Sequence, residues 1–218
     1  MGSIRKGLLG FSSLFLLLCA FQTAYADPIP YQNVGVYNAN TYSFTAASTG
    51  DVVAYFAGST AGYDNQLGML VNGILTSAGF GLDNHSSYVG QSFDLGHVTA
   101  GDSLTFVLNI ATLNNARIYS NPTMNIAYDG PGAPGDNHIY VTPYTATSPI
   151  LPGVPTGTFV AFEDLKYPGS DYNYNDETFV FSNVISGAAV PEPGTVMLFS
   201  VGLLSLAIYG RRRMNDKI

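Results

Sequence analysis

The chain has 218 residues, a formal net charge of −7 and a single cysteine. Residues 27–190 hold 13 acidic residues against two basic ones, Arg117 and Lys166, which gives that part of the chain a net charge of −11. A field of this sign repels nucleic acid, so nucleic-acid binding is excluded as a function. The cysteine is Cys19, near the N-terminus, so the rest of the chain has no disulfide and no thiolate metal site.

The N-terminus has the pattern of a secretory signal peptide over residues 1–26. Two basic residues precede an apolar stretch, Leu8–Phe21, and a pair of small residues, Ala24 and Ala26, follows at the spacing that signal peptidase needs. The apolar stretch has 14 residues, whereas a membrane span needs about 20. We therefore predict a signal helix that signal peptidase removes, so that the exported chain begins at Asp27. A retained N-terminal anchor is the alternative.

Residues 27–190 form the expected folded body, whose length is that of one ordinary domain. Short apolar segments recur between clusters of turn-forming residues, and no segment has the period of a helix. Residues 103–111 alternate between apolar and polar side chains like a half-buried strand, and Asn72-Gly73 has the pattern of a hairpin turn. We predict an all-β fold, an antiparallel β-sandwich or jelly roll. The expected strand segments are 52–57, 66–76, 103–111, 138–144, 157–165 and 178–184.

The last segment, residues 191–218, has three parts in a fixed order. A Pro-Glu-Pro motif comes first, an apolar stretch of 15 residues (Thr195–Tyr209) follows, and three arginines come near the end. At 1.5 Å per residue the stretch is about 22 Å long as a helix, a marginal membrane span. The arginines resist translocation and keep the C-terminus on the cytoplasmic side. The residues that carry these features are Pro191, Glu192, Pro193, Arg211, Arg212 and Arg213.

This arrangement resembles the PEP-CTERM sorting signal of exported bacterial proteins. The resemblance implies recognition by an exosortase and cleavage near the Pro-Glu-Pro motif. It also implies a transmembrane intermediate in the inner membrane and a final place at the cell surface or outside the cell. Proteins with this signal are associated with exopolysaccharide and biofilm. A plain single-pass C-terminal anchor is the alternative.

An acidic segment near the end of the body is the best candidate for a site. Five carboxylates fall within 15 residues, with one lysine among them, and such groups repel one another unless they bind a proton or a cation. Hard oxygen ligands in this number, without His or Cys, suit calcium. The predicted ligands are Glu163, Asp164, Asp171, Asn173, Asn175, Asp176 and Glu177. The alternative is an acidic hairpin whose Asp and Asn side chains only form turns.

The same segment resembles a β-rich module of unknown function that recurs in exported bacterial proteins. The resemblance lies in Phe-Glu-Asp-Leu at 162–165 and in Ser-Asp-Tyr-Asn-Tyr-Asn-Asp-Glu at 170–177, where Asn173 replaces the usual Asp. The segments at 63–68 and 136–140 are also similar to that module. This resemblance implies an extracellular β domain with a calcium site and supplies no activity.

Other chemistry has less support in the sequence. The three histidines lack the spacing of a zinc site, and we expect His138 to be a surface turn residue. Glu163 and Asp164 are adjacent on a predicted strand and should point to opposite faces, unlike a glycosidase pair. We therefore predict a non-enzymatic protein; a polysaccharide-binding protein or a polysaccharide-active enzyme is the alternative. Loop tyrosines that could contact sugars are Tyr63, Tyr88, Tyr167, Tyr172 and Tyr174.

Overall fold

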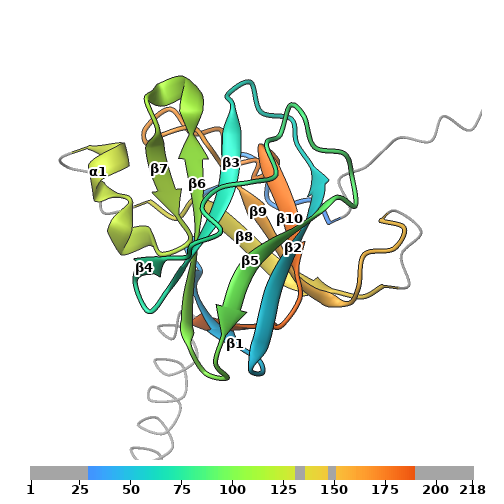
Figure 1. Ribbon diagram of the computed structural model, residues 1–218. Helices are drawn as coiled ribbons and strands as arrows, with labels where there is room; N and C mark the ends of the chain where they lie inside the picture. The colour runs from blue at the N-terminus through green and yellow to red at the C-terminus, as the bar shows by residue number, and fades with distance from the viewer. Residues whose placement is uncertain (1–28, 131–135, 147–150, 190–218) are drawn as a thin grey trace, which may run out of the picture.

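The computed structural model describes residues 29–130, 136–146 and 151–189. The predicted signal peptide and sorting tail lie outside these residues. The described part is almost entirely β, and two antiparallel sheets pack face to face (Figure 1). The predicted β-sandwich is therefore confirmed.

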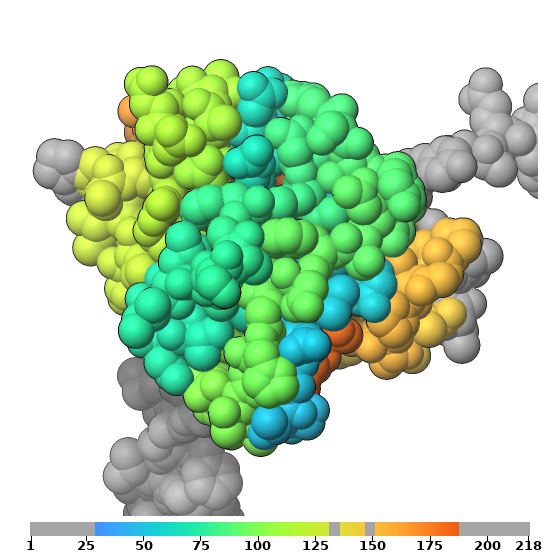
Figure 2. Space-filling view, viewed as in Figure 1, coloured from blue at the N-terminus to red at the C-terminus, as the bar shows by residue number. Residues whose placement is uncertain are grey.

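The two sheets are built as follows. The first sheet has the order β11 (Val184–Ala189), β1 (Thr41–Ala46), β6 (Ser103–Ile110), β3 (Asn65–Val71) and β4 (Ile74–Leu75), and β7 (Ala116–Tyr119) also pairs with β6. The second has the order β5 (Ser92–Val98), β2 (Gly50–Gly58), β10 (Glu177–Phe181), β9 (Gly157–Phe162) and β8 (Ile139–Tyr144). Three short helical turns are η1 (Ala111–Leu113), η2 (Pro122–Met124) and α1 (Ile126–Asp129). In the space-filling view, the segment from η1 to α1 forms one flank of the molecule (Figure 2).

The core between the sheets follows the alternation read in the sequence. The apolar side chains at alternate positions of β6, Leu104, Phe106, Leu108 and Ile110, are buried in the core between the sheets. Val107, on the other face of the strand, is buried as well. The ring of Phe106 stacks on that of Phe181 in the opposite sheet, with ring centroids 3.8 Å apart. Because aromatic side chains bury a large apolar area, this contact joins the two sheets at the centre of the sandwich.

The hairpin predicted at Asn72-Gly73 is also confirmed, since β3 pairs with β4 across this turn. Both residues have positive φ angles, 50° and 83°, as a two-residue turn of type I′ requires. Asn and Gly adopt such angles at the lowest cost, so the turn fixes the register of the hairpin.

Some strand boundaries differ from the prediction. Strands β1, β5 and β7 were not predicted. β1 and β5 pair only with strands that are distant in the sequence, whereas β7 pairs with the preceding strand β6. The predicted strand 178–184 is two strands, β10 and β11, separated by a turn in which Asn183 has a φ of 60°. The predicted strand 157–165 ends at Phe162, where β9 stops.

Strands β9 and β10 are neighbours, and Phe162 pairs with Glu177. The acidic segment is therefore the connection between them, and its two ends are held side by side at one end of the second sheet. In the described part of the chain, none of the helices is long and apolar enough to span a bilayer.

Candidate functional site

The β9–β10 pairing brings the two ends of the acidic segment together. Glu163 and Asp164 leave β9 where Asp176 and Glu177 enter β10, and all four side chains are buried. Between them, Asp171 is exposed, and Asn173 and Asn175 are half-buried. Burying this many carboxylates is costly unless each is hydrogen-bonded, protonated or bound to a cation.

Glu163 joins the two halves of the acidic segment through hydrogen bonds from its buried side chain. Its Oε1 accepts a hydrogen bond from the backbone N–H of Leu165, and its Oε2 accepts one from the backbone N–H of Asn173, both at 3.2 Å. Burial raises the pKa of Glu163 to about 8, and the nearby charges of Asp176 and Asp171 add to the shift. A hydrogen bond between the carboxyls of Glu163 and Asp171 acts in the same direction. The surroundings of Glu163 therefore favour its protonated form.

Asp164 and Asp176 form a second pair. The Oδ2 of Asp176 accepts a hydrogen bond from the backbone N–H of Asp164 at 2.7 Å, and the Oδ2 of Asp164 accepts one from the Asn65 side chain at 2.7 Å. Burial, followed by the charge of Asp164, raises the pKa of Asp176 to about 7. Burial also raises the pKa of Asp164. Both residues line a hollow of about 300 Å³, together with Gly62, Tyr63 and Leu165.

Glu177 lies deeper than the other carboxylates. Glu177, Phe179 and Phe181 occupy every second position of β10, so their side chains share one face of the strand. That face packs against the other sheet. Neither carboxyl oxygen of Glu177 has a hydrogen-bond partner among the described residues, and the same holds for Oδ1 of Asn65. Burial, and then the charges of Asp83, Asp164 and Asp176, raise the pKa of Glu177 well above its usual value. Burial therefore favours the neutral form of this carboxyl.

The exposed part of the segment is held by its own side chains. Asp171 Oδ1 accepts a hydrogen bond from the backbone N–H of Asn173, and Asn173 Oδ1 accepts one from the backbone N–H of Asn175. The residues between them, Tyr172 and Tyr174, have φ angles of 51° and 52°. The alternate spacing of the three polar residues thus produces two successive Asx turns, which is the alternative to calcium binding for these side chains.

The prediction that His138 is a surface turn residue is wrong, because its side chain is only 1% exposed. Its Nδ1 lies 2.9 Å from the backbone oxygen of Glu163, and its Nε2 lies 3.0 Å from Asp129 Oδ1. The carboxylate of Asp129 also accepts hydrogen bonds from the backbone N–H groups of Tyr167 and Asp136. His138 and Asp129 thus tie the acidic segment to α1 and to the start of β8.

Two contributors to this region, Asn65 and Asp129, were not predicted as site residues. Asn65 lies in the segment 63–68, which is similar in sequence to the exported module, but no spacing rule joins it to Asp164, 99 residues later. Tyr174, predicted as an exposed sugar-contacting residue, is 2% exposed, which corrects that prediction. Its hydroxyl donates a hydrogen bond to the backbone oxygen of Asn137 and accepts one from the backbone N–H of Asn38. Tyr174 is therefore part of the core.

A preformed metal site is not found in the part of the chain that the structure describes. No three side chains of His, Cys, Asp or Glu are arranged there as a metal-binding group. Calcium binding by the seven predicted ligands therefore stays a prediction. The structure does bring four of them, Glu163, Asp164, Asp171 and Asp176, into two interacting carboxyl pairs.

The comparison with known families identifies the tail. Residues 189–213 match the PEP-CTERM protein-sorting motif, which agrees with the prediction for this segment. The motif indicates an exported protein that is processed by an exosortase and travels through the membrane toward the cell surface. The match begins at Ala189, the last residue of β11, and does not cover the folded body. The similarity of the body to the module of unknown function stays a prediction. No curated protein and no solved structure matches the chain.

Proposed function

We propose that the protein is a non-enzymatic component of the extracellular polysaccharide matrix or biofilm, with a β-sandwich that calcium stabilises. In this proposal, signal peptidase removes residues 1–26 and the exosortase cuts near Pro191–Pro193. The acidic body, residues 27–190, then reaches the cell surface or the medium. The membrane holds the protein only through its tail, before processing.

One observation carries the calcium part of the proposal: the buried carboxylates of the acidic segment, Glu163 to Glu177, have no basic partner among the described residues. Among the described residues, no Lys or Arg forms an ion pair with a carboxylate, and the three pairs present involve histidine only. The pKa values of Glu163 and Asp176, about 8 and about 7, express the cost of ionising these groups where they lie. A bound divalent cation would offset that cost, because its positive charge takes the place of the bound protons.

The residues fit calcium better than other common metals. Carboxylate and amide oxygens are hard ligands, and calcium accepts six to eight of them in irregular geometry. Glu163, Asp164, Asp171 and Asp176 would hold the ion, and the unpartnered Oδ1 of Asn65 is an additional oxygen beside Asp164. The hollow lined by Asp164 and Asp176 gives an ion a route to this cluster.

The burial of Glu163 supports a non-enzymatic role over the polysaccharide-active enzyme. A glycosidase needs a carboxyl with a raised pKa that reaches the glycosidic oxygen. Glu163 has the raised pKa, but its side chain is fully buried and both oxygens accept backbone hydrogen bonds. A side chain buried in this way cannot reach the glycosidic oxygen of a polysaccharide.

Thermal unfolding with and without calcium tests the proposal. A ligand that binds only the native state at 100 times its dissociation constant adds about 2.7 kcal/mol of stability. For a domain of this size, we expect a rise in Tm of roughly 5 to 10 °C, reversed by a chelator. Magnesium at the same concentration should give a smaller rise, because it demands regular octahedral geometry. An unchanged Tm at millimolar calcium would contradict the proposal.

A further inference from the structure

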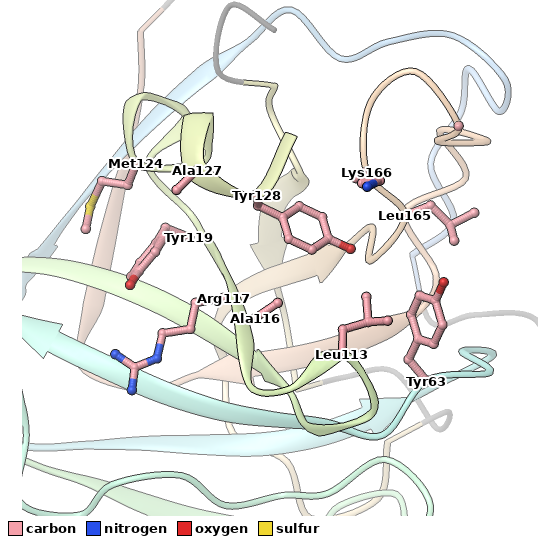
Figure 3. Close-up of a pocket in the computed structure, with 11 residues that line it drawn as sticks. Tyr63, Leu113, Ala116, Arg117, Tyr119, Met124, Ala127, Tyr128, Leu165 and Lys166 are labelled. Carbon is pink, nitrogen blue, oxygen red and sulfur yellow. The ribbon is translucent and has the colours of Figure 1, made fainter. Parts of the chain in front are cut away.

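A second, larger hollow lies beside the acidic one. It has a volume of about 700 Å³ and lies between the β7–α1 segment and the loop that follows β9 (Figure 3). It shares Tyr63 and Leu165 with the acidic hollow. We call it the basic groove, and the residues that matter here are Tyr63, Arg117, Tyr119, Tyr128 and Lys166.

The charge of the basic groove is unusual for this protein. Arg117 and Lys166 are the only Lys or Arg residues in residues 27–190, and both line this groove. Both are exposed, and neither pairs with a carboxylate in the described ranges. The guanidinium of Arg117 lies 5.2 Å from the centroid of the Phe80 ring, which holds it in place while leaving its N–H donors free of any acidic partner.

The ring of Tyr128 lies between the two cations, and two further tyrosines lie beside them. Figure 3 shows Arg117 and Tyr119 on one side of Tyr128, and Lys166 and Tyr63 on the other. The three tyrosines are partly exposed. The ring of Tyr128 is fixed, because its hydroxyl donates a hydrogen bond of 2.6 Å to the backbone oxygen of Asp164. Partly exposed tyrosine rings give a flat, rigid contact surface with polar edges, which suits the face of a sugar ring.

We propose that the basic groove binds a segment of acidic polysaccharide whose sugar units carry carboxylates, as in a polymer that contains uronic acids. Arg117 and Lys166 pair with two carboxylates of the chain, and the tyrosines contact the sugar rings between them. The inference rests on the proposed matrix function and names the ligand class that the groove takes. Because the body carries −11, a ligand with its carboxylates spaced by neutral sugars fits better than a dense polyanion.

The test uses the full-length protein, purified in a non-ionic detergent, and isothermal titration calorimetry. The probes are oligosaccharides of six to eight sugars from hyaluronan, alginate and polygalacturonate, each compared with its carboxyl-reduced form. We expect binding to at least one acidic probe and at least about tenfold weaker binding to the reduced form. The affinity should also fall with added salt.

Substitutions locate the binding. Lys166→Gln and Arg117→Gln should each weaken binding about tenfold, because each removes a charged hydrogen-bond donor. Ser92→Asp, an exposed position on β5, changes the net charge by the same amount and should leave the affinity within about twofold. Three results would overturn the proposal. The affinity could be equal for acidic and reduced probes, it could be unchanged by both groove substitutions, or a glutamate-rich hexapeptide could bind as tightly as the probes. Failure of all three acidic probes to bind would also overturn it.

Measuring the same samples with calcium and with chelator separates the two proposals. Probe binding without a calcium-dependent rise in Tm would count against the calcium site and leave the groove standing. A calcium-dependent rise in Tm without probe binding would count against the groove alone.

Discussion

The two hollows beside the β9–β10 connection are neighbours with opposite charge. The smaller is lined by Asp164 and Asp176, and the larger by Arg117 and Lys166, while Tyr63 and Leu165 belong to both. The two acidic residues are buried, and burial raises their pKa values. The two basic residues are exposed and form no ion pair with a carboxylate in the described part of the chain.

This difference separates stability from recognition. A buried charge alters the free energy of unfolding, because folding removes it from water. An exposed charge contributes little to stability but remains available to a ligand. We therefore expect changes in the acidic hollow to alter folding, and changes in the basic groove to alter binding.

The largest expected effect is the response of the calcium-free protein to pH. The folded-state pKa values of Glu163 and Asp176, about 8 and about 7, lie above the ordinary values of 4.5 and 3.8 for these side chains. The folded state therefore binds more protons than the unfolded state between about pH 4 and pH 8. Stability is full below that window and is lost as the pH rises through it. In chelator, the free energy of unfolding should fall by about 2 kcal/mol or more between pH 5 and pH 8.5, measured by urea denaturation.

Calcium should suppress this fall, because the ion replaces the protons that the carboxylates lose. Glu163→Gln should reduce the fall in chelator, since the amide does not titrate. If the free energy of unfolding stays constant or rises over this pH range, the pKa values of the buried carboxylates are not raised in the folded state.

The next effect separates the acidic hollow from the basic groove directly. Asp176→Asn keeps an oxygen that can accept the hydrogen bond from the backbone N–H of Asp164, but it removes one carboxylate. A tenfold loss of calcium affinity removes about 1.4 kcal/mol of stabilisation, so the calcium-dependent rise in Tm should fall by about half or more. Lys166→Gln is the matched control and should keep the full rise. If calcium raised the Tm of both variants equally, the acidic hollow would not be the calcium site.

The smallest effect is expected at the basic groove itself. Arg117→Gln removes an exposed cation–π contact with Phe80 and should lower the free energy of unfolding by about 0.5 to 1 kcal/mol, measured in urea. Lys166→Gln should change it by less than about 0.5 kcal/mol, because the side chain is exposed. A loss above about 2 kcal/mol for either variant would mean that the groove cations serve the fold and not a ligand.

Local patterns in the sequence predicted the parts of the fold that depend on local chemistry. The alternation of β6 and the Asn72-Gly73 turn needed only neighbouring residues, and both were confirmed. The burial of His138 was missed, because the contacts that cover it come from Asp129 and from Glu163, 25 residues away. For the same reason Asn65 was not expected beside Asp164.

The sequence by itself determined the sorting tail, the acidic charge of the body and the all-β class, since each is written in a run or a period of neighbouring residues. Only the tertiary structure decided which carboxylates are buried and that Arg117 and Lys166, 49 positions apart, line one groove. The physical reason is that burial and charge pairing depend on contacts between distant strands and loops. The packing of the two sheets sets those contacts.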